Sequence, residues 1–267
     1  MATEFAHAMR AAELEQAISK LPSSGKLLEL GAGDGWQAHT LQQLGFDVTA
    51  IDVKAARPGT AQHFPVSLYD GRVLPFPDNS FDVIYSSNVL EHVVDFAQIQ
   101  SELARVLRAD GTAVHCVPST VWRFWTTLSH PLYAARLAWR LKGALSKPTS
   151  SNLALADSKK SIQNTSPLTL LLMGLVSPRH GEQGSLLSEH WLFSRRGWNS
   201  RFEETGWHID SVTPAHLFYT GNELFGLRMA TRLRRGLASI LGSSTLIYTL
   251  HAYRTTCEDF DDIPSPM

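Results

Sequence analysis

The sequence predicts an α/β fold in which helices flank one open sheet. Three observations support this prediction. Short apolar runs alternate with amphipathic helical segments, a glycine-rich loop joins the first apolar run to a helix, and the alternation recurs along most of the chain. Such strand–helix–strand units build parallel sheets, because the crossover helix returns the chain to the same edge.

The first half of the chain shows this alternation in regular order. We expect an N-terminal helix over 1–20, a strand over 26–30, a helix over 36–44 that ends at Gly45, and a strand over 46–51 that closes on Asp52. After them we expect a weak strand over 62–68, a strand over 81–86, a helix over 95–107 and, beyond a turn at Asp110-Gly111, a strand over 112–117.

The alternation stops after Pro118 and resumes at Phe193. We interpret residues 119–192 as a helical insertion that covers the substrate pocket of a single domain spanning 1–267, because the strands on either side would complete one sheet. After the insertion we expect a helix over 194–205, a strand over 207–212, a helix over 223–241 and a final strand over 244–253.

Composition excludes several classes of protein. The 267 residues are 43% hydrophobic and 18% charged with a formal net charge of -1, which suits a globular protein and argues against a nucleic-acid partner. The only two cysteines, Cys116 and Cys257, are far apart, so we expect neither a disulfide framework nor a metal site. The N-terminus lacks the apolar core of a secretory signal, and the apolar stretch 168–176 is too short to span a bilayer; we expect a cytoplasmic protein.

The glycine-rich loop indicates a nucleotide-like ligand. It reads Glu29-Leu-Gly31-Ala-Gly33-Asp-Gly35 between a strand and a helix, where glycines allow a tight turn and close approach of backbone amides to a ligand. Glu29 can accept a hydrogen bond from an ammonium group, and the carboxylate of Asp52 can accept both hydroxyls of a ribose. The spacing departs from the NAD pattern G-x-G-x-x-G, because the third glycine comes one position early.

With these residues the chain resembles the class I S-adenosylmethionine-dependent methyltransferases, in particular the type 11 methyltransferase domain family. Four further stretches match that family in order and spacing: Asp70 ahead of Leu74-Pro75-Phe76, the segment 78–82, the segment 86–93 and the segment 105–111. The resemblance implies a Rossmann-like, doubly wound, seven-stranded sheet, mostly parallel with an antiparallel last strand. It also implies S-adenosyl-L-methionine as cofactor, bound by Glu29, Gly31, Gly33, Gly35, Asp52, Asp70, Gly71 and Ser86, with Asp70 near the adenine.

Methyl transfer from a sulfonium needs alignment of the acceptor, and a base only when the acceptor must lose a proton. Candidates for that base are His92, which the resemblance places at the methionine end of the cofactor, and His180, Glu189 or His190 in the insertion. Each of these residues would also suit an ordinary solvated loop.

The acceptor is expected to be a small molecule, with a lipid-like or apolar one as a hypothesis. Aromatic, aliphatic and basic residues are mixed over 121–142, and four arginines lie among leucines over 224–237, a composition typical of helices at a membrane surface. Peripheral membrane contact through these segments is therefore a hypothesis beside that of an ordinary lid. Two other functions remain open: a non-catalytic cofactor-binding or interaction protein on the same fold, and an NAD-dependent oxidoreductase.

Overall fold

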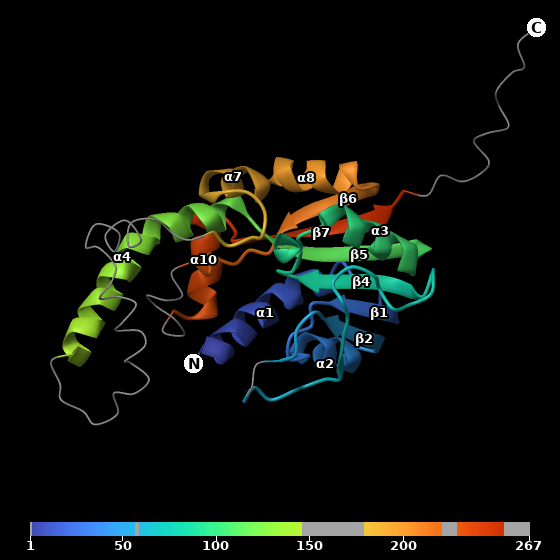
Figure 1. Cartoon of the computed structure of the whole chain (residues 1–267), viewed down its shortest axis with the longest axis horizontal. Coiled ribbons are helices and arrows are strands. Elements are labelled where there is room, and N and C mark those ends of the chain that lie inside the picture. Colours follow the sequence, from blue (N-terminus) through green and yellow to red (C-terminus); the bar gives the residue numbers. More distant parts are fainter. Residues whose placement is uncertain (1, 57–58, 146–178, 221–228, 254–267) are drawn as a thin grey trace, which may run out of the picture.

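A seven-stranded sheet forms the centre of the computed structural model, which describes residues 2–56, 59–145, 179–220 and 229–253 (Figure 1). The strand order is β3-β2-β1-β4-β5-β7-β6. The strands are β1 (Gly25–Leu30), β2 (Phe46–Asp52), β3 (Val66–Leu68), β4 (Phe81–Ser87), β5 (Leu107–Pro118), β6 (Trp207–Pro214) and β7 (Thr245–Ala252). β7 runs antiparallel to both of its neighbours, β5 and β6, and the other adjacent strands pair in parallel, so the predicted mostly parallel sheet with an antiparallel last strand is confirmed.

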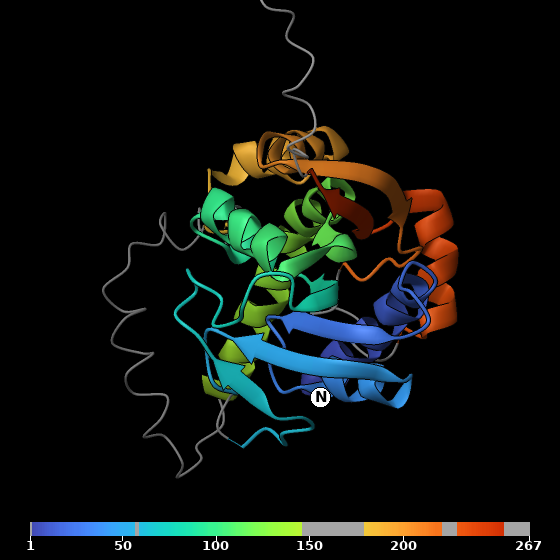
Figure 2. The ribbon, with the colours of Figure 1, turned by 90° about the vertical axis from the view of Figure 1, so that its right-hand side faces the viewer.

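Helices cover both faces of this sheet (Figure 2). One face carries α1 (Ala2–Ile18), α2 (Trp36–Gln43) and α10 (Thr231–Leu241). The opposite face carries α3 (Phe96–Val106) and α8 (Arg195–Glu204). A short 3-10 turn, η1 (Leu90–His92), and two further helices, α4 (Thr120–Leu145) and α7 (Leu186–Leu192), lie between β4 and α8 in the chain.

Alternation along the central strands assigns each side chain to one of these two faces. Leu27 and Tyr85 pack in the cluster that includes Leu14 of α1. Leu28 and Ile84, one position away, pack with the aromatic residues of α3 and α8. The same alternation decides which polar residues at the strand ends can reach a ligand.

Two strands differ from the prediction in length. β5 begins at Leu107, so Asp110-Gly111 lies inside the strand rather than in a turn. The pairing with β4 is irregular there, since Phe81 pairs with Leu107 but Val83 pairs with Thr112, and such irregularities absorb extra residues without ending a strand. β3 keeps only three residues of the predicted strand over 62–68.

The predicted insertion begins with α4, which extends away from the body of the molecule (Figure 1). The strands on either side of 119–192 belong to one sheet, as expected. Residues 146–178 of the insertion lie outside the described residues, as do 221–228, where the helix predicted over 223–241 would begin. Among the described residues, no helix combines the length and the apolar character needed to cross a bilayer.

A histidine is enclosed in the middle of the sheet. His115 on β5 is fully buried, its Nδ1 lies 2.7 Å from the hydroxyl of Ser86, and its ring stacks on Phe202. Its Nε2 has no hydrogen-bond partner among the described residues. Burial lowers the pKa of His115 to about 3, because a charged imidazolium would lose its hydration there.

This histidine predicts a loss of stability in acid. The folded chain cannot protonate His115 at pH 5, whereas the unfolded chain does so below its ordinary pKa of about 6.5. The free energy of unfolding should therefore fall by about 2 kcal/mol between pH 7 and pH 5 on account of this residue. Urea unfolding at the two pH values should show a smaller loss for His115→Gln than for the wild type.

The control is His208→Gln, at an exposed histidine on β6, which should keep the wild-type dependence on pH. An unchanged loss of stability in His115→Gln would contradict the assignment.

Candidate functional site

The glycine-rich loop after β1 folds over the end of β2. The amides of Gly31 and Ala32 both donate to the carbonyl of Ile51, at 2.8 and 3.0 Å. The backbone amide of Gly33 donates to Oδ2 of Asp52 at 2.8 Å, and the backbone amide of Lys54 donates to Oδ1 of Asp52 at 3.0 Å. The predicted loop and the predicted acid are therefore joined directly, and both line one cavity of about 560 Å³, the outer cavity.

The three glycines of this loop have different neighbours, although all have positive φ. A Cβ on Gly31 would lie 2.3 Å from a methyl group of Val89, and one on Gly35 would lie 2.8 Å from the backbone of Phe64. A Cβ on Gly33 would meet nothing within 4 Å. Gly31 and Gly35 thus permit close packing of the loop, whereas the backbone at Gly33 faces open space that a ligand can enter.

Helix α1 closes the other side of the outer cavity. Nε2 of His7 lies 2.8 Å from Oδ2 of Asp34, and the His7 ring stacks on Trp36 with centroids 5.6 Å apart. Arg10 also lines this cavity, and its Nη1 donates to the hydroxyl of Ser87 at 3.2 Å. The sequence indicated the helix but not this contribution, because α1 lies far from the loop in the chain.

Glu29 lies beneath the loop rather than on the cavity wall. Its side chain is buried, and its Oε2 has no hydrogen-bond partner among the described residues. Burial raises the pKa of Glu29 to about 8, the amide of Ala38 opposes this shift, and Asp34 and Asp52 add to it. A contact between Glu29 and the ammonium group of a cofactor stays a prediction.

Four other predicted cofactor residues, namely Gly35, Asp70, Gly71 and Ser86, do not line the outer cavity. Oδ1 of Asp70 accepts hydrogen bonds from the amides of Arg72 and Val73, which lower its pKa, and Gly71 beside it has a φ of +79°. Ser86 is fully buried and faces His115. Because side chains alternate along β4, the cavity is lined by Ser87 and by Asn88 beyond it, which sequence reasoning did not single out.

A second, smaller cavity lies next to the first. This inner cavity has a volume of about 240 Å³, and Ala6, Arg10 and Asn88 line both cavities. Its remaining wall combines apolar and polar side chains from α1, η1 and three later segments: Phe5, Met9, Glu13, Glu91, His92, Pro118, Trp122, His180 and Tyr219.

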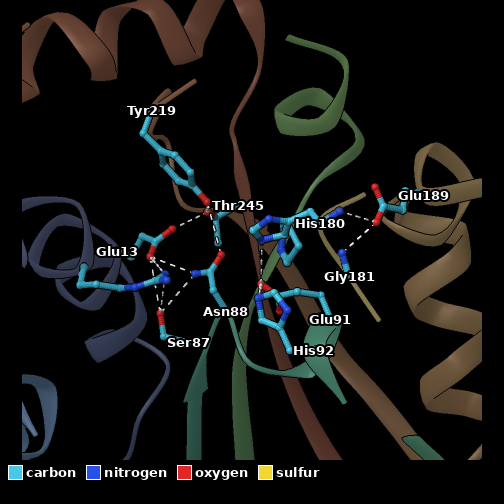
Figure 3. A network of polar contacts seen from close by, with 12 residues as sticks. Glu13, Ser87, Asn88, Glu91, His92, His180, Gly181, Glu189, Tyr219 and Thr245 are labelled. Carbon is cyan, nitrogen blue, oxygen red and sulfur yellow. Dashed lines mark hydrogen bonds and ion pairs between the residues drawn. The ribbon is translucent and has the colours of Figure 1, made fainter. Parts of the chain in front are cut away.

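A buried carboxylate organises the polar part of the inner cavity (Figure 3). Glu13 of α1 is fully buried and accepts hydrogen bonds from Arg10 at 2.8 Å, from Asn88 at 3.3 Å and from the hydroxyl of Thr245. The hydroxyl of Tyr219 donates to Oδ1 of Asn88 at 3.3 Å. Apart from Arg10, which lies one turn away on the same helix, these residues come from distant parts of the chain, so no local pattern in the sequence could reveal the whole network.

The structure brings together two of the three candidate histidines. The rings of His92 and His180 lie 4.9 Å apart between centroids, and Trp122 packs edge-on against His180 at 4.5 Å. Burial lowers the pKa of both side chains, that of His180 to about 4, so both imidazoles are neutral at pH 7. His190 lines neither cavity and contributes a backbone carbonyl, which accepts a hydrogen bond from Thr120.

Glu189, the fourth candidate, holds the backbone at His180 in place (Figure 3). Its Oε1 accepts the amides of His180 and Gly181, both at 2.8 Å. Its Oε2 lies 3.0 Å from Nε of Arg123, and both side chains are buried. Arg123, predicted as part of a basic surface, is therefore internal, and so is Arg234 of α10, which donates to the carbonyl of Phe218.

Comparison with known proteins identifies the central part of the chain. Residues 28–115, from the glycine-rich loop to β5, match the family model described as a methyltransferase domain. This segment belongs to the methyltransferase domain family. The family predicted for this segment is thus confirmed.

Curated relatives of the methyltransferase domain are similar over part of their length. An uncharacterized methyltransferase of Mycobacterium sp. (strain KMS) is 34% identical over 142 residues, which cover 48% of this chain and 54% of that protein. A demethylmenaquinone methyltransferase of Corynebacterium urealyticum is 36% identical over 93 residues, 34% of this chain and 40% of that protein. The chain spans about half of the length of the curated relatives that it matches.

Solved structures share the fold over a longer stretch. An S-adenosylmethionine-dependent methyltransferase from Mesorhizobium loti has a TM-score of 0.50 at 17% identity, covering 90% of this chain and 97% of that one. A geranyl diphosphate C-methyltransferase from Streptomyces coelicolor, whose structure holds Mg²⁺, geranyl diphosphate and S-adenosyl-L-homocysteine, has a TM-score of 0.51 at 14% identity, covering 92% and 82%.

The outer cavity fits the cofactor of this family. Its volume lies in the usual range for small-molecule sites of about 300–1,000 Å³. The open backbone at Gly33 lies next to the carboxylate of Asp52, and we expect that carboxylate to hold the ribose hydroxyls.

Removal of the Asp52 carboxylate should weaken cofactor binding. A hydrogen bond to a charged group contributes about 1.5–3 kcal/mol, so Asp52→Ala should raise the Kd for S-adenosylmethionine and S-adenosylhomocysteine about 10- to 100-fold. Isothermal titration calorimetry measures both constants. Asp47→Ala, at an exposed position near the opposite end of β2, is the matched control and should bind like the wild type.

Titration with NAD⁺ in the same cell should give no binding heat. Equal affinity of Asp52→Ala and wild type would contradict the assignment of Asp52, and binding of NAD⁺ alone would favour the oxidoreductase.

Proposed function

We propose that the chain is an S-adenosylmethionine-dependent methyltransferase that methylates a small-molecule acceptor held in the inner cavity. The observation behind this proposal is the wall that the two cavities share, formed by Ala6, Arg10 and Asn88. Methyl transfer is an in-line displacement and requires the acceptor to lie directly beside the methyl group of the cofactor. Adjacent cavities of unequal size meet this requirement.

The lining of the inner cavity favours a partly apolar acceptor with one polar group. Phe5, Met9 and Trp122 offer apolar contacts, whereas Glu91, His92 and His180 gather on one side. We infer that the polar group of the acceptor binds at these three side chains and that the remainder packs on the apolar wall. The demethylmenaquinone methyltransferase of Corynebacterium urealyticum, a partial relative, supports an apolar small molecule of lipid-like character.

Labelling of cell extracts tests the function directly. The purified chain should transfer the labelled methyl group of S-adenosylmethionine into the lipid or small-molecule pool of a fractionated extract. Asp52→Ala should transfer less at limiting cofactor, and Asp47→Ala should match the wild type. Label in the protein pool alone would contradict a small-molecule acceptor, and no label in any pool would favour a non-catalytic binding protein.

We also propose that α4 contacts a membrane surface from which such an acceptor is drawn. Phe124, Leu128 and Leu132 follow one another at four-residue spacing along α4, and their exposed fractions are 50%, 57% and 65%. Because side chains four apart share a face of a helix, these three residues form one apolar stripe. The buried arginines Arg123 and Arg234 do not take part.

Cosedimentation with liposomes checks this contact. The wild type should bind vesicles that contain anionic lipid, and Leu128→Glu combined with Leu132→Glu should bind several-fold less, because charged side chains are excluded from the acyl region. Leu44→Glu, at an exposed leucine after α2, is the control and should bind like the wild type. Absence of wild-type binding at any content of anionic lipid would overturn the proposal.

A further inference from the structure

Three side chains at the inner cavity direct their donor atoms toward one point (Figure 3). Oε1 of Glu91 lies 3.8 Å from Nε2 of His92 and 3.9 Å from Nε2 of His180, and one ligand atom from each residue lies within 4.8 Å of the other two. Around a Zn²⁺ ion with bonds of about 2.0–2.1 Å, ligand atoms lie about 3–4 Å apart. Small side-chain rotations would therefore bring the three atoms to one ion.

Glu91 differs from Glu13 and Glu189, the other buried carboxylates of this region, because it accepts no hydrogen bond from another described residue. Glu13 and Glu189 each accept several hydrogen bonds or an ion pair from neighbouring residues. The side chain of Glu91 is only 3% exposed, and neither of its oxygens accepts a hydrogen bond from another described residue. A buried carboxylate without a partner is costly, so its position indicates a positively charged ligand.

The positive side chains near Glu91 are engaged elsewhere. Arg10 and Arg201 act on the carboxylate through their charge. Arg10 is paired with Glu13 at 2.8 Å, and the guanidinium of Arg201 lies over the ring of Phe96 at 3.9 Å. The imidazoles of His92 and His180 are the groups that remain close to the carboxylate oxygens.

The surrounding backbone holds this cluster in place. The amide of Glu182 donates to the carbonyl of Glu91 at 3.1 Å, which joins the His180 turn to η1. Gly181 packs so closely there that a Cβ would lie 2.8 Å from the same carbonyl. Glu189 fixes the amides of His180 and Gly181 in turn. Such outer support orients the ligands in known metal sites.

We propose that Glu91, His92 and His180 bind a divalent transition-metal ion, with Zn²⁺ as the type ion, and that the acceptor coordinates it through an oxygen atom. Two histidines and one carboxylate are a known ligand set for catalytic Zn²⁺, and they leave open positions for a substrate. The role of the acceptor rests on the proposed function, whereas the metal site rests on geometry alone. This proposal revises the expectation from the cysteine count that no metal site exists.

A metal ion at this point would act on the acceptor as a Lewis acid. A hydroxyl or enol oxygen bound there loses its proton to water more readily, which makes the acceptor a better nucleophile. The acceptor then forms a bond to the methyl carbon while the electron pair of the carbon–sulfur bond returns to sulfur. Neither histidine is needed as a base in this arrangement, which suits an acceptor class that carries a hydroxyl, enol or carboxylate oxygen.

Titration of the chelator-treated full chain with Zn²⁺ tests the site. We expect each chain to bind one Zn²⁺ ion at the Glu91 cluster. The variants Glu91→Gln, His92→Ala and His180→Ala should each raise the Kd for Zn²⁺ by at least about tenfold. Mg²⁺, which prefers oxygen ligands, should compete poorly. Unchanged Zn²⁺ affinity in all three variants would overturn the proposal.

Two controls separate this site from other histidines. His190→Ala removes a neighbouring imidazole that does not line the cavity, and it should leave Zn²⁺ binding unchanged. His7→Ala disrupts the group formed by His7, Asp34 and His63 at the outer cavity, the second place in the described residues where a metal ion would find three ligands. If only His7→Ala weakens binding, the ion belongs there and the proposal fails.

Two further measurements test separately whether a variant is folded and whether the chain transfers methyl groups. Retained affinity for S-adenosylhomocysteine, which binds in the other cavity, shows that Glu91→Gln is folded. If the wild type transfers methyl groups but does not bind Zn²⁺, the metal-site proposal is contradicted and the methyltransferase proposal stands. If the cluster binds Zn²⁺ but no pool of the extract is methylated, the metal-site proposal stands and the methyltransferase proposal is contradicted.

Discussion

Parallel pairing of β1, β2 and β4 is the constraint on which the candidate site depends. Leu30 pairs with Ile51 on one side and with Ser86 on the other, so all three strands end at the same edge of the sheet. This shared edge therefore brings together the loop after β1, the carboxylate of Asp52 and the residues after β4. Ligands in open α/β sheets bind at this edge for the same reason.

Buried charge then distinguishes the two cavities. The outer cavity lies between the glycine-rich loop and α1, and its carboxylate Asp52 accepts hydrogen bonds from two amides. The inner cavity contains buried carboxylates that meet different partners. Glu13 is surrounded by donors from three segments, whereas Glu91 faces two histidines. A buried carboxylate that lacks a hydrogen-bond donor can still bind a ligand, whereas one whose oxygens all accept hydrogen bonds from the protein cannot.

The sequence predicts the features that depend on short stretches of chain. The loop with Gly31 and Asp52 is recognisable because strand, turn and acid follow one another within about twenty-five residues, and the fold class follows from the same alternation. The resemblance implies a cofactor contact for Ser86, whose hydroxyl lies 2.7 Å from Nδ1 of His115 inside the sheet; one position decides which face of β4 a side chain occupies. The choice of face depends on packing between segments.

Convergence of distant segments explains what the sequence did not predict. Tyr219 and Glu13 are far from each other and from η1 in the chain, and no spacing rule links them. The sequence offers His92 and His180 only as separate candidates, and the turn at Gly181 places their rings next to each other. The extent of β5 was missed because Asp110-Gly111 usually marks a turn, whereas here the pairing with β4 accommodates it.

The network around Glu13 also bears on the order in which the molecule is assembled. Glu13 is near the beginning of the chain, and its partners Asn88 and Thr245 come from the middle and from the last strand. Because α1 precedes β7 in the chain, its acid lacks the Thr245 partner during synthesis until β7 has entered the sheet. The hydrogen bonds that hold α1 through this acid are thus complete only after β7 has joined the sheet, although most of the residues around them are made much earlier.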